Sequence, residues 1–143
     1  MRLDGVKEIC QQPDAASWTC KIIGNGRLPD VPAIARAIRE VGDVFWLRGV
    51  EVVAIGRVVS RGGMLHLELE QTRDRLQLEQ LARKVQWSFG KQSAHPITEA
   101  ERTALTRLKA ALSKDSARVR IVGPLVGRTI EVREFSFLGD PDR

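Results

Sequence analysis

Apolar and polar residues alternate strictly in the middle of the chain. Residues 64–70 carry leucine at every second position, and the alternation returns over residues 75–78 after a Thr-Arg-Asp turn. Because successive side chains of a strand point to opposite faces, this period predicts strands with one buried face. Together with the β-prone stretch 44–59, the two runs predict a meander of three antiparallel strands. A helix over residues 73–85 is the alternative, since apolar residues there also fit helical spacing.

The first fifty residues predict a hairpin followed by a helix. Residues 6–10 and 18–23 are rich in strand formers and flank a polar turn. Asp30 then offers a helix N-cap, Pro32 suits the first turn, and Gly42 supplies a stop. Apolar residues recur at helical spacing between these two signals, so we expect an amphipathic helix there.

A second helix is predicted over residues 98–112. Thr98 and Glu101 have the spacing of a capping box, in which each side chain accepts a hydrogen bond from the other's backbone N–H. The expected buried face of this helix consists of Leu105, Leu108 and Leu112.

Two closing strands are predicted after this helix, over residues 119–122 and 129–137. Gly123, Pro124 and Gly127 lie between them and are expected to form the connection. The aromatic residues Phe45, Phe135 and Phe137 are expected in the core.

The order of predicted elements from Val50 onward is three strands, a helix and two strands, which resembles the OB-fold. Gly56 suits the strongly bent first strand of that barrel, and residues 119–125 and 130–135 suit its closing pair. The resemblance implies a five-stranded barrel with a helix between the third and fourth strands. It also implies a surface for single-stranded nucleic acid.

The first part of the chain resembles the back half of a heavy-metal-associated domain, whose fold is ferredoxin-like. The run Leu3-Asp4-Gly5-Val6-Lys7 is similar to the Gly-Val at the end of that family's first helix. Residues 20–23 would then form its third strand and residues 33–42 its second helix. The metal-binding Cys-x-x-Cys loop of that family has no counterpart in this sequence. The resemblance therefore implies part of a fold, with no metal ligand and no cofactor.

These observations predict an α+β chain that is rich in antiparallel strands. An OB-like barrel is preceded by a partial ferredoxin-like β-hairpin and helix. The predicted boundaries are 1–49 for the hairpin and helix, 50–138 for the barrel with its helix 98–112, and 139–143 for a frayed tail.

Composition fits a folded, soluble chain, with 43% hydrophobic and 29% charged residues among 143. No apolar run approaches the roughly 18 residues that span a bilayer, and the N-terminal residues contain no apolar segment of the kind found in signal peptides. The sequence gives no indication of a compartment. The net charge is +5, from 23 Lys and Arg against 18 Asp and Glu. This excess favours acidic partners, although a solvated basic surface is the simpler interpretation.

Cys10 and Cys20 flank the turn of the predicted hairpin and could lie opposite one another. Two small packed side chains are the favoured interpretation. A disulfide or a pair of thiolate ligands for a soft metal are the alternatives. Two cysteines ten residues apart are a far weaker metal signal than paired Cys-x-x-Cys motifs.

No familiar catalytic pattern is present: the sequence contains no Gly-x-Ser-x-Gly, no His-Glu-x-x-His and no Walker loop. His66 alternates with leucines, so we expect it on the solvent face of its strand. We therefore expect no catalytic residues and no enzymatic activity.

The first hypothesis is a non-enzymatic binding or assembly module that acts by packing against a protein partner or within a larger assembly. The alternative is an OB-type protein that binds single-stranded nucleic acid by phosphate contacts and base stacking. The residues proposed for that role are Trp46, Arg48, Arg57, Arg61, Lys84, Trp87, Phe89 and Lys91. A further alternative is an accessory domain of a metal-handling system.

Overall fold

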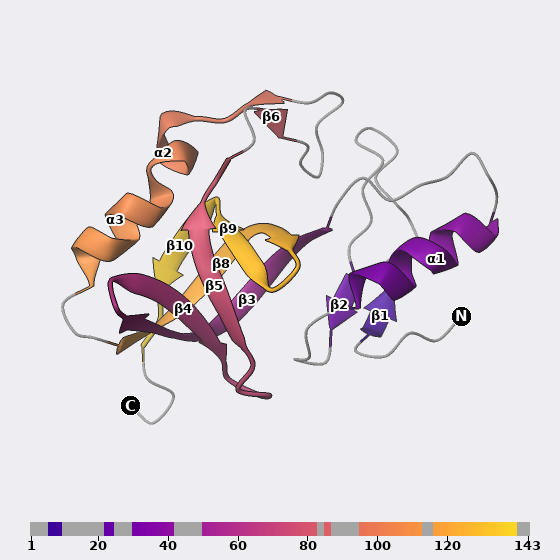
Figure 1. Ribbon diagram of the computed structural model, residues 1–143, viewed down its shortest axis with the longest axis horizontal. Helices are drawn as coiled ribbons and strands as arrows, with labels where there is room; N and C mark the ends of the chain where they lie inside the picture. Colours follow the sequence, from indigo (N-terminus) through magenta and orange to yellow (C-terminus); the bar gives the residue numbers. More distant parts are fainter. Residues whose placement is uncertain are drawn as a thin grey trace. The chain divides into compact units, whose positions relative to one another are not determined.

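A computed structural model describes residues 6–9, 22–24, 30–41, 50–82, 85–86, 95–112 and 116–139 of the chain. The chain divides into two compact units, one made of residues 1–48 and 83–97 and the other of residues 49–82 and 98–143 (Figure 1). The first unit is therefore discontinuous in sequence, because a segment between two parts of the second unit belongs to it.

The first unit contains two short antiparallel strand pairs. Strand β1 (Val6–Ile9) pairs with β2 (Ile22–Gly24), in agreement with the predicted hairpin. Strand β6 (Val85–Gln86) pairs with β7 (His95–Pro96). The ferredoxin-like assignment of this part of the chain stays a prediction.

Helix α1 (Val31–Val41) begins where the sequence predicted it to begin. The side chain of Asp30 accepts a hydrogen bond from the backbone N–H of Ala33 at 3.0 Å, as an N-cap does. Ile34 and Ala37 are buried, and these two residues lie on one face of the helix because they are three positions apart.

The second unit is a closed five-stranded barrel. Its strands are β3 (Val50–Arg61), β4 (Met64–Leu69), β5 (Arg75–Gln80), β8 (Ser116–Val126) and β9 (Thr129–Val132), with β10 (Glu134–Phe137) continuing along β8. Around the barrel, β3 pairs with β4, β4 with β5, β5 with β9, β9 with β8, and β8 with β3. The predicted OB-like barrel is confirmed at the level of a closed five-stranded barrel.

The sequence predicted antiparallel strands, but one strand pair of the barrel is parallel. Strands β5 and β9 pair in parallel, whereas the other four pairings of the ring are antiparallel. An odd number of strands cannot alternate in direction all the way round a closed ring. One parallel pair is therefore unavoidable, and it lies where the ring closes.

The inward side chains of the barrel form its core. The leucines of β4 and β5 that alternate with polar residues in the sequence all point inward, which excludes the alternative helix over residues 73–85. Other strands contribute their β-branched residues. The largest fully buried side chains are Val58, Leu67, Leu76, Leu108, Val119, Ile121, Ile130 and Val132.

Two glycines allow neighbouring strands to approach each other closely. A Cβ atom on Gly56 would lie 2.2 Å from the carbonyl oxygen of Glu68, and one on Gly123 would lie 1.7 Å from that of Glu131. Any other residue would force the strands apart at these points. Gly123 does not form a turn, contrary to the sequence-based prediction, because β8 runs through it. The turn lies at Gly127, whose φ is +62°.

The last predicted strand, residues 129–137, is interrupted at Arg133. Leu125 lies opposite Ile130, whereas Val122 lies opposite Glu134, so the register changes by one residue between β9 and β10. The backbone N–H of Arg133 donates to the carbonyl of Val122 at 2.8 Å. At this interruption the Arg133 side chain forms ion pairs with Glu51 and Glu101.

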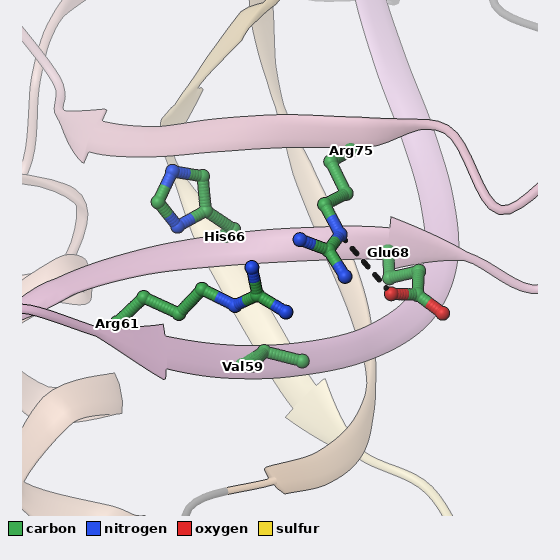
Figure 2. Close-up of a pocket in the computed structure, with 5 residues that line it drawn as sticks. All are labelled: Val59, Arg61, His66, Glu68 and Arg75. Atoms are coloured by element: carbon green, nitrogen blue, oxygen red, sulfur yellow. Dashed lines mark hydrogen bonds and ion pairs between the residues drawn. The ribbon is translucent and has the colours of Figure 1, made fainter.

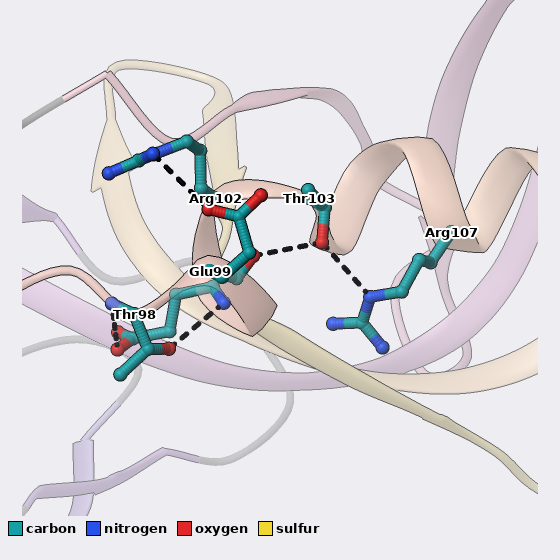
Figure 3. Close-up of polar contacts among 6 residues, drawn as sticks. Thr98, Glu99, Arg102, Thr103 and Arg107 are labelled. Carbon is teal, nitrogen blue, oxygen red and sulfur yellow. Dashed lines mark hydrogen bonds and ion pairs between the residues drawn. The ribbon is translucent and has the colours of Figure 1, made fainter.

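The predicted helix 98–112 is two helices, α2 (Glu99–Arg102) and α3 (Ala104–Ala111), divided at Thr103. The capping box is present: Glu101 N–H donates to the Thr98 hydroxyl at 3.2 Å, and Thr98 N–H donates to the Glu101 carboxylate at 3.1 Å. At the division, the Thr103 hydroxyl donates to the carbonyl of Glu99 and accepts from Arg107 (Figure 3).

Helix α3 packs against β5 and β10, and buries Leu105 and Leu108 there, while Leu112 is half-buried. None of the helices in the described part of the chain has the length and apolar character that crossing a membrane requires.

We expect Leu108→Ala to lower the free energy of unfolding by roughly 2–5 kcal/mol, because truncating a buried leucine removes its transfer energy and leaves a cavity. The Leu108 side chain is 0% exposed. Urea unfolding followed by circular dichroism measures the change. Thr106→Ala, on the exposed side of the same helix, is the control and should change stability by less than about 0.5 kcal/mol. An equally small effect of Leu108→Ala would contradict the packing of α3.

Candidate functional site

The outer face of the barrel over β3, β4 and β5 is formed by the side chains that do not enter the core. The strand register places these side chains in rows. Arg57, Glu68 and Arg75 lie side by side across the three strands, and Val59 and His66 share the next row. Inward leucines fix the strand orientation, so each of these polar residues must face outward.

An open depression of about 140 Å³ lies on this face. Figure 2 shows the side chains that surround it, with those of β3, β4 and β5 directed over the same part of the sheet. Its lining consists of Val59, Arg61, His66, Glu68 and Arg75. The turn between β3 and β4, at Gly62 and Gly63, adjoins Arg61.

Positive charge exceeds negative charge in the depression. Arg75 Nε lies 3.3 Å from Glu68 Oε2, and both side chains are partly exposed. Arg61 makes no ion pair with any residue that the structure describes. Two guanidinium groups therefore face one carboxylate, so the depression attracts an anion.

His66 has a ring nitrogen that makes no hydrogen bond to any residue that the structure describes. Its Nδ1 atom is buried and has no hydrogen-bond partner among the described residues. A buried polar atom without a partner is uncommon in folded proteins and calls for an explanation. His66 also lines the depression.

A second ion pair borders this face. The Arg118 guanidinium on β8 binds the Glu70 carboxylate through Nε and through Nη2, the latter at 3.4 Å, while its Nη1 donates to the carbonyl of Gly139 at 2.9 Å. The hydrogen bond from Arg118 lowers the pKa of Glu70 below 4.5. Arg57 lies directly across the strands from Arg118, and its positive charge also lowers the pKa of Glu70.

A third ionic cluster lies where β9 gives way to β10. The buried guanidinium of Arg133 binds Glu51 on β3 at 2.9 Å and Glu101 on α2 at 3.1 Å. Burial raises the pKa of Glu51 above 4.5, and this effect exceeds the opposing attraction of Arg133. The cluster joins three elements of the barrel and is structural.

Of the residues predicted for nucleic-acid binding, Arg57 and Arg61 lie on the outer face of β3, and Arg61 lines the depression. The other predicted residues lie outside the described part of the chain, and so do both cysteines. These residues are Trp46, Arg48, Lys84, Trp87, Phe89, Lys91, Cys10 and Cys20. Their proposed roles stay predictions.

Sequence reasoning missed Arg75 and gave no role to His66 and Glu68. His66 does lie on the face opposite the leucines, as predicted, although it is half-buried. The available signal was the alternation itself, which assigns Arg75, His66 and Glu68 to outward positions. Only the tertiary structure shows that these three side chains line the same depression as Arg61.

The described aromatic residues of the barrel lie on β10, away from the depression. The rings of Phe135 and Phe137 form a T-shaped pair with centroids 5.7 Å apart, and the Arg107 guanidinium lies 5.5 Å from the Phe135 centroid. Phe137 is 44% exposed. The prediction that it belongs to the core is wrong, because Phe137 lies on β10, which pairs with β8 at the edge of the sheet.

Among the residues that the structure describes, no group of three or more His, Cys, Asp or Glu side chains is placed to hold a metal ion. No protein-family model, curated protein or solved structure gives a significant match to this chain.

The pKa shifts of Glu51 and Glu70 predict opposite dependences of stability on pH. Because folding raises the pKa of Glu51, its contribution to the free energy of unfolding falls as the pH rises from 4.5 through the folded pKa. Because folding lowers the pKa of Glu70, its contribution is present above 4.5 and is lost as the pH falls through the folded pKa.

Urea unfolding of wild type, Glu51→Gln and Glu70→Gln across this pH range measures both effects. The free energy of unfolding of wild type minus that of Glu51→Gln should fall as the pH rises. The corresponding difference between wild type and Glu70→Gln should increase as the pH rises. Two differences that change in the same direction would contradict the assignment.

Proposed function

We propose that the second unit is an OB-type binding module that holds single-stranded nucleic acid on the outer face of β3, β4 and β5. The order of its strands supports the assignment: β5 pairs with β9, and the α2–α3 segment lies between β5 and β8. OB-fold barrels bind oligonucleotides on the face of their second and third strands and on adjoining loops. In this chain those strands are β4 and β5.

The observation that carries the proposal is the gathering of Arg57, Arg61 and Arg75 on this face, around an open depression. Guanidinium groups bind phosphate through two parallel hydrogen bonds and stay charged at every physiological pH. Among the residues that line the depression, Glu68 balances one of two guanidinium charges, so the depression keeps a positive excess where a phosphate group would lie.

Phosphate contacts rather than base stacking would supply most of the affinity at this face. No aromatic side chain among the residues that the structure describes lines the depression, and the described aromatics of the barrel lie on β10. We therefore expect weak discrimination between base sequences. Stacking by Trp87 or Phe89, if these residues approach the strand, would add to this affinity.

Binding of a fluorescent deoxythymidine oligonucleotide should weaken steeply with salt, with a slope near −0.7 per phosphate neutralised, because bound counterions are released. Arg57→Gln should weaken binding at low salt and reduce the slope by about 0.7. Fluorescence anisotropy across a salt series measures both quantities.

The matched control is Arg102→Gln, which removes the same charge from α2, where Arg102 pairs with Glu99 at the surface. It should leave affinity and slope near those of wild type. Equal effects of the two variants would mean that net charge alone attracts the oligonucleotide, and the proposed face would be wrong.

Packing against a protein partner is the second candidate function. Val53 and Ile55 lie on the outward side of β3 and are 59% and 40% exposed. Arg120 lies across from Ile55 on β8. Apolar side chains next to arginine are typical of protein–protein interfaces, so this end of β3 is where such a partner would bind.

This second candidate predicts that the chain elutes with a partner in extracts of its native cells and that Val53→Asn shifts it to the size of the free chain. Val126→Asn is the control, because Val126 is 52% exposed at the β8–β9 turn. Oligonucleotide binding that survives Val53→Asn, with no change in size, would favour the first candidate.

A further inference from the structure

The depression beside Arg61 is too small for most organic ligands. Its volume of about 140 Å³ compares with about 300–1,000 Å³ for pockets that enclose drug-sized molecules. It therefore suits a single compact group, with the rest of any larger ligand outside on the sheet.

The charges around the depression match a group with one negative charge. Arg61 and Arg75 contribute two positive charges, and Glu68 contributes one negative charge. These three side chains sum to one positive charge, which a phosphodiester would neutralise. The neighbouring charged groups on the same face are Arg57 on β3, Glu70 directly after β4 and Glu79 on β5.

We propose that this depression is a phosphate-binding subsite, in which Arg61 and Arg75 hold one phosphodiester group. When no ligand is bound, Glu68 forms an ion pair with Arg75. The proposal rests on the proposed function, because the phosphodiester would belong to the bound strand. Glu68 is then an internal competitor of the ligand.

The existing ion pair is suited to such an exchange. Arg75 and Glu68 meet through one pair of atoms at 3.3 Å, with side chains 46% and 31% exposed. Exposed pairs of this kind contribute little to stability, so Arg75 can change partners without disturbing the fold. His66 also lines the depression, so its imidazole lies beside the proposed phosphodiester.

A phosphodiester fits this set of donors better than a carboxylate does. Glu68 is itself a carboxylate in the depression, and it engages Arg75 while Arg61 makes no ion pair with any described residue. The tetrahedral phosphate group directs its oxygens more widely, so two guanidinium groups can each donate to it.

The experiment uses the full chain and dimethyl phosphate, a phosphodiester with a constant charge of minus one at neutral pH. Only two histidines are present in the sequence, so the imidazole NMR signals of His66 are assigned by loss in His66→Asn. Dimethyl phosphate should shift these signals saturably. Arg61→Gln should weaken this binding on the order of tenfold, as expected for loss of a charge-assisted hydrogen bond.

The distinguishing variant is Glu68→Gln, which should strengthen dimethyl phosphate binding about threefold or more, because it removes the internal competitor. Glu79→Gln is the matched control, since it removes the same charge from β5 outside the lining of the depression. Each variant is checked by urea unfolding. Equal effects of Glu68→Gln and Glu79→Gln would overturn the proposed competition, and stronger shifts with acetate would identify a carboxylate site and overturn the phosphate assignment.

The same variants with a deoxythymidine oligonucleotide separate this proposal from the function on which it rests. Oligonucleotide binding that is lost in Arg57→Gln but unchanged in Arg61→Gln and Glu68→Gln would overturn the subsite and leave the binding face intact. Binding of dimethyl phosphate with the expected variant effects, but without oligonucleotide binding, would support the subsite and overturn the nucleic-acid function.

Discussion

The parallel pairing of β5 with β9 is the contact on which the barrel depends. It joins strands that are separated in sequence by β6, β7, two helices and β8, and it closes a ring whose other pairings are antiparallel. Closure removes the exposed strand edges of an open sheet. It also defines an inside, where alternate leucines and β-branched residues meet, and an outside, where the polar residues of β3, β4 and β5 form one continuous face.

Closure in turn requires local features at two places. Gly56 lets β3 bend against β4, and Gly123 lets β8 approach β9 more closely than a side chain would allow. The register change at Arg133 then carries its guanidinium between Glu51 and Glu101. Burial raises the pKa of Glu51 despite this pairing, so the cluster serves to fix the geometry of three elements rather than to maximise stability.

The outer face has the opposite character, because its ionic contacts are exposed and can be exchanged. Arg75 and Glu68 meet in a partly exposed pair, whereas Arg133 is buried between two carboxylates. A rigid buried frame below a set of exchangeable surface charges is the arrangement that a binding face requires. His66 lines the depression beside Arg61, and its buried Nδ1 atom has no hydrogen-bond partner among the described residues.

The sequence by itself determined the features that depend on near neighbours. Period-two alternation identified β4 and β5, and the capping box at Thr98 identified the start of α2, because both signals act within a few residues. Gly123 was misread as a turn because local chemistry cannot distinguish a turn from a close approach of strands. Only the tertiary structure decided the parallel closure, the meeting of Arg61 with His66 and Arg75, and the pairing of Arg133 with Glu51, 82 residues away in sequence. These contacts depend on strand register across the closed ring, and no short segment of the chain encodes that register.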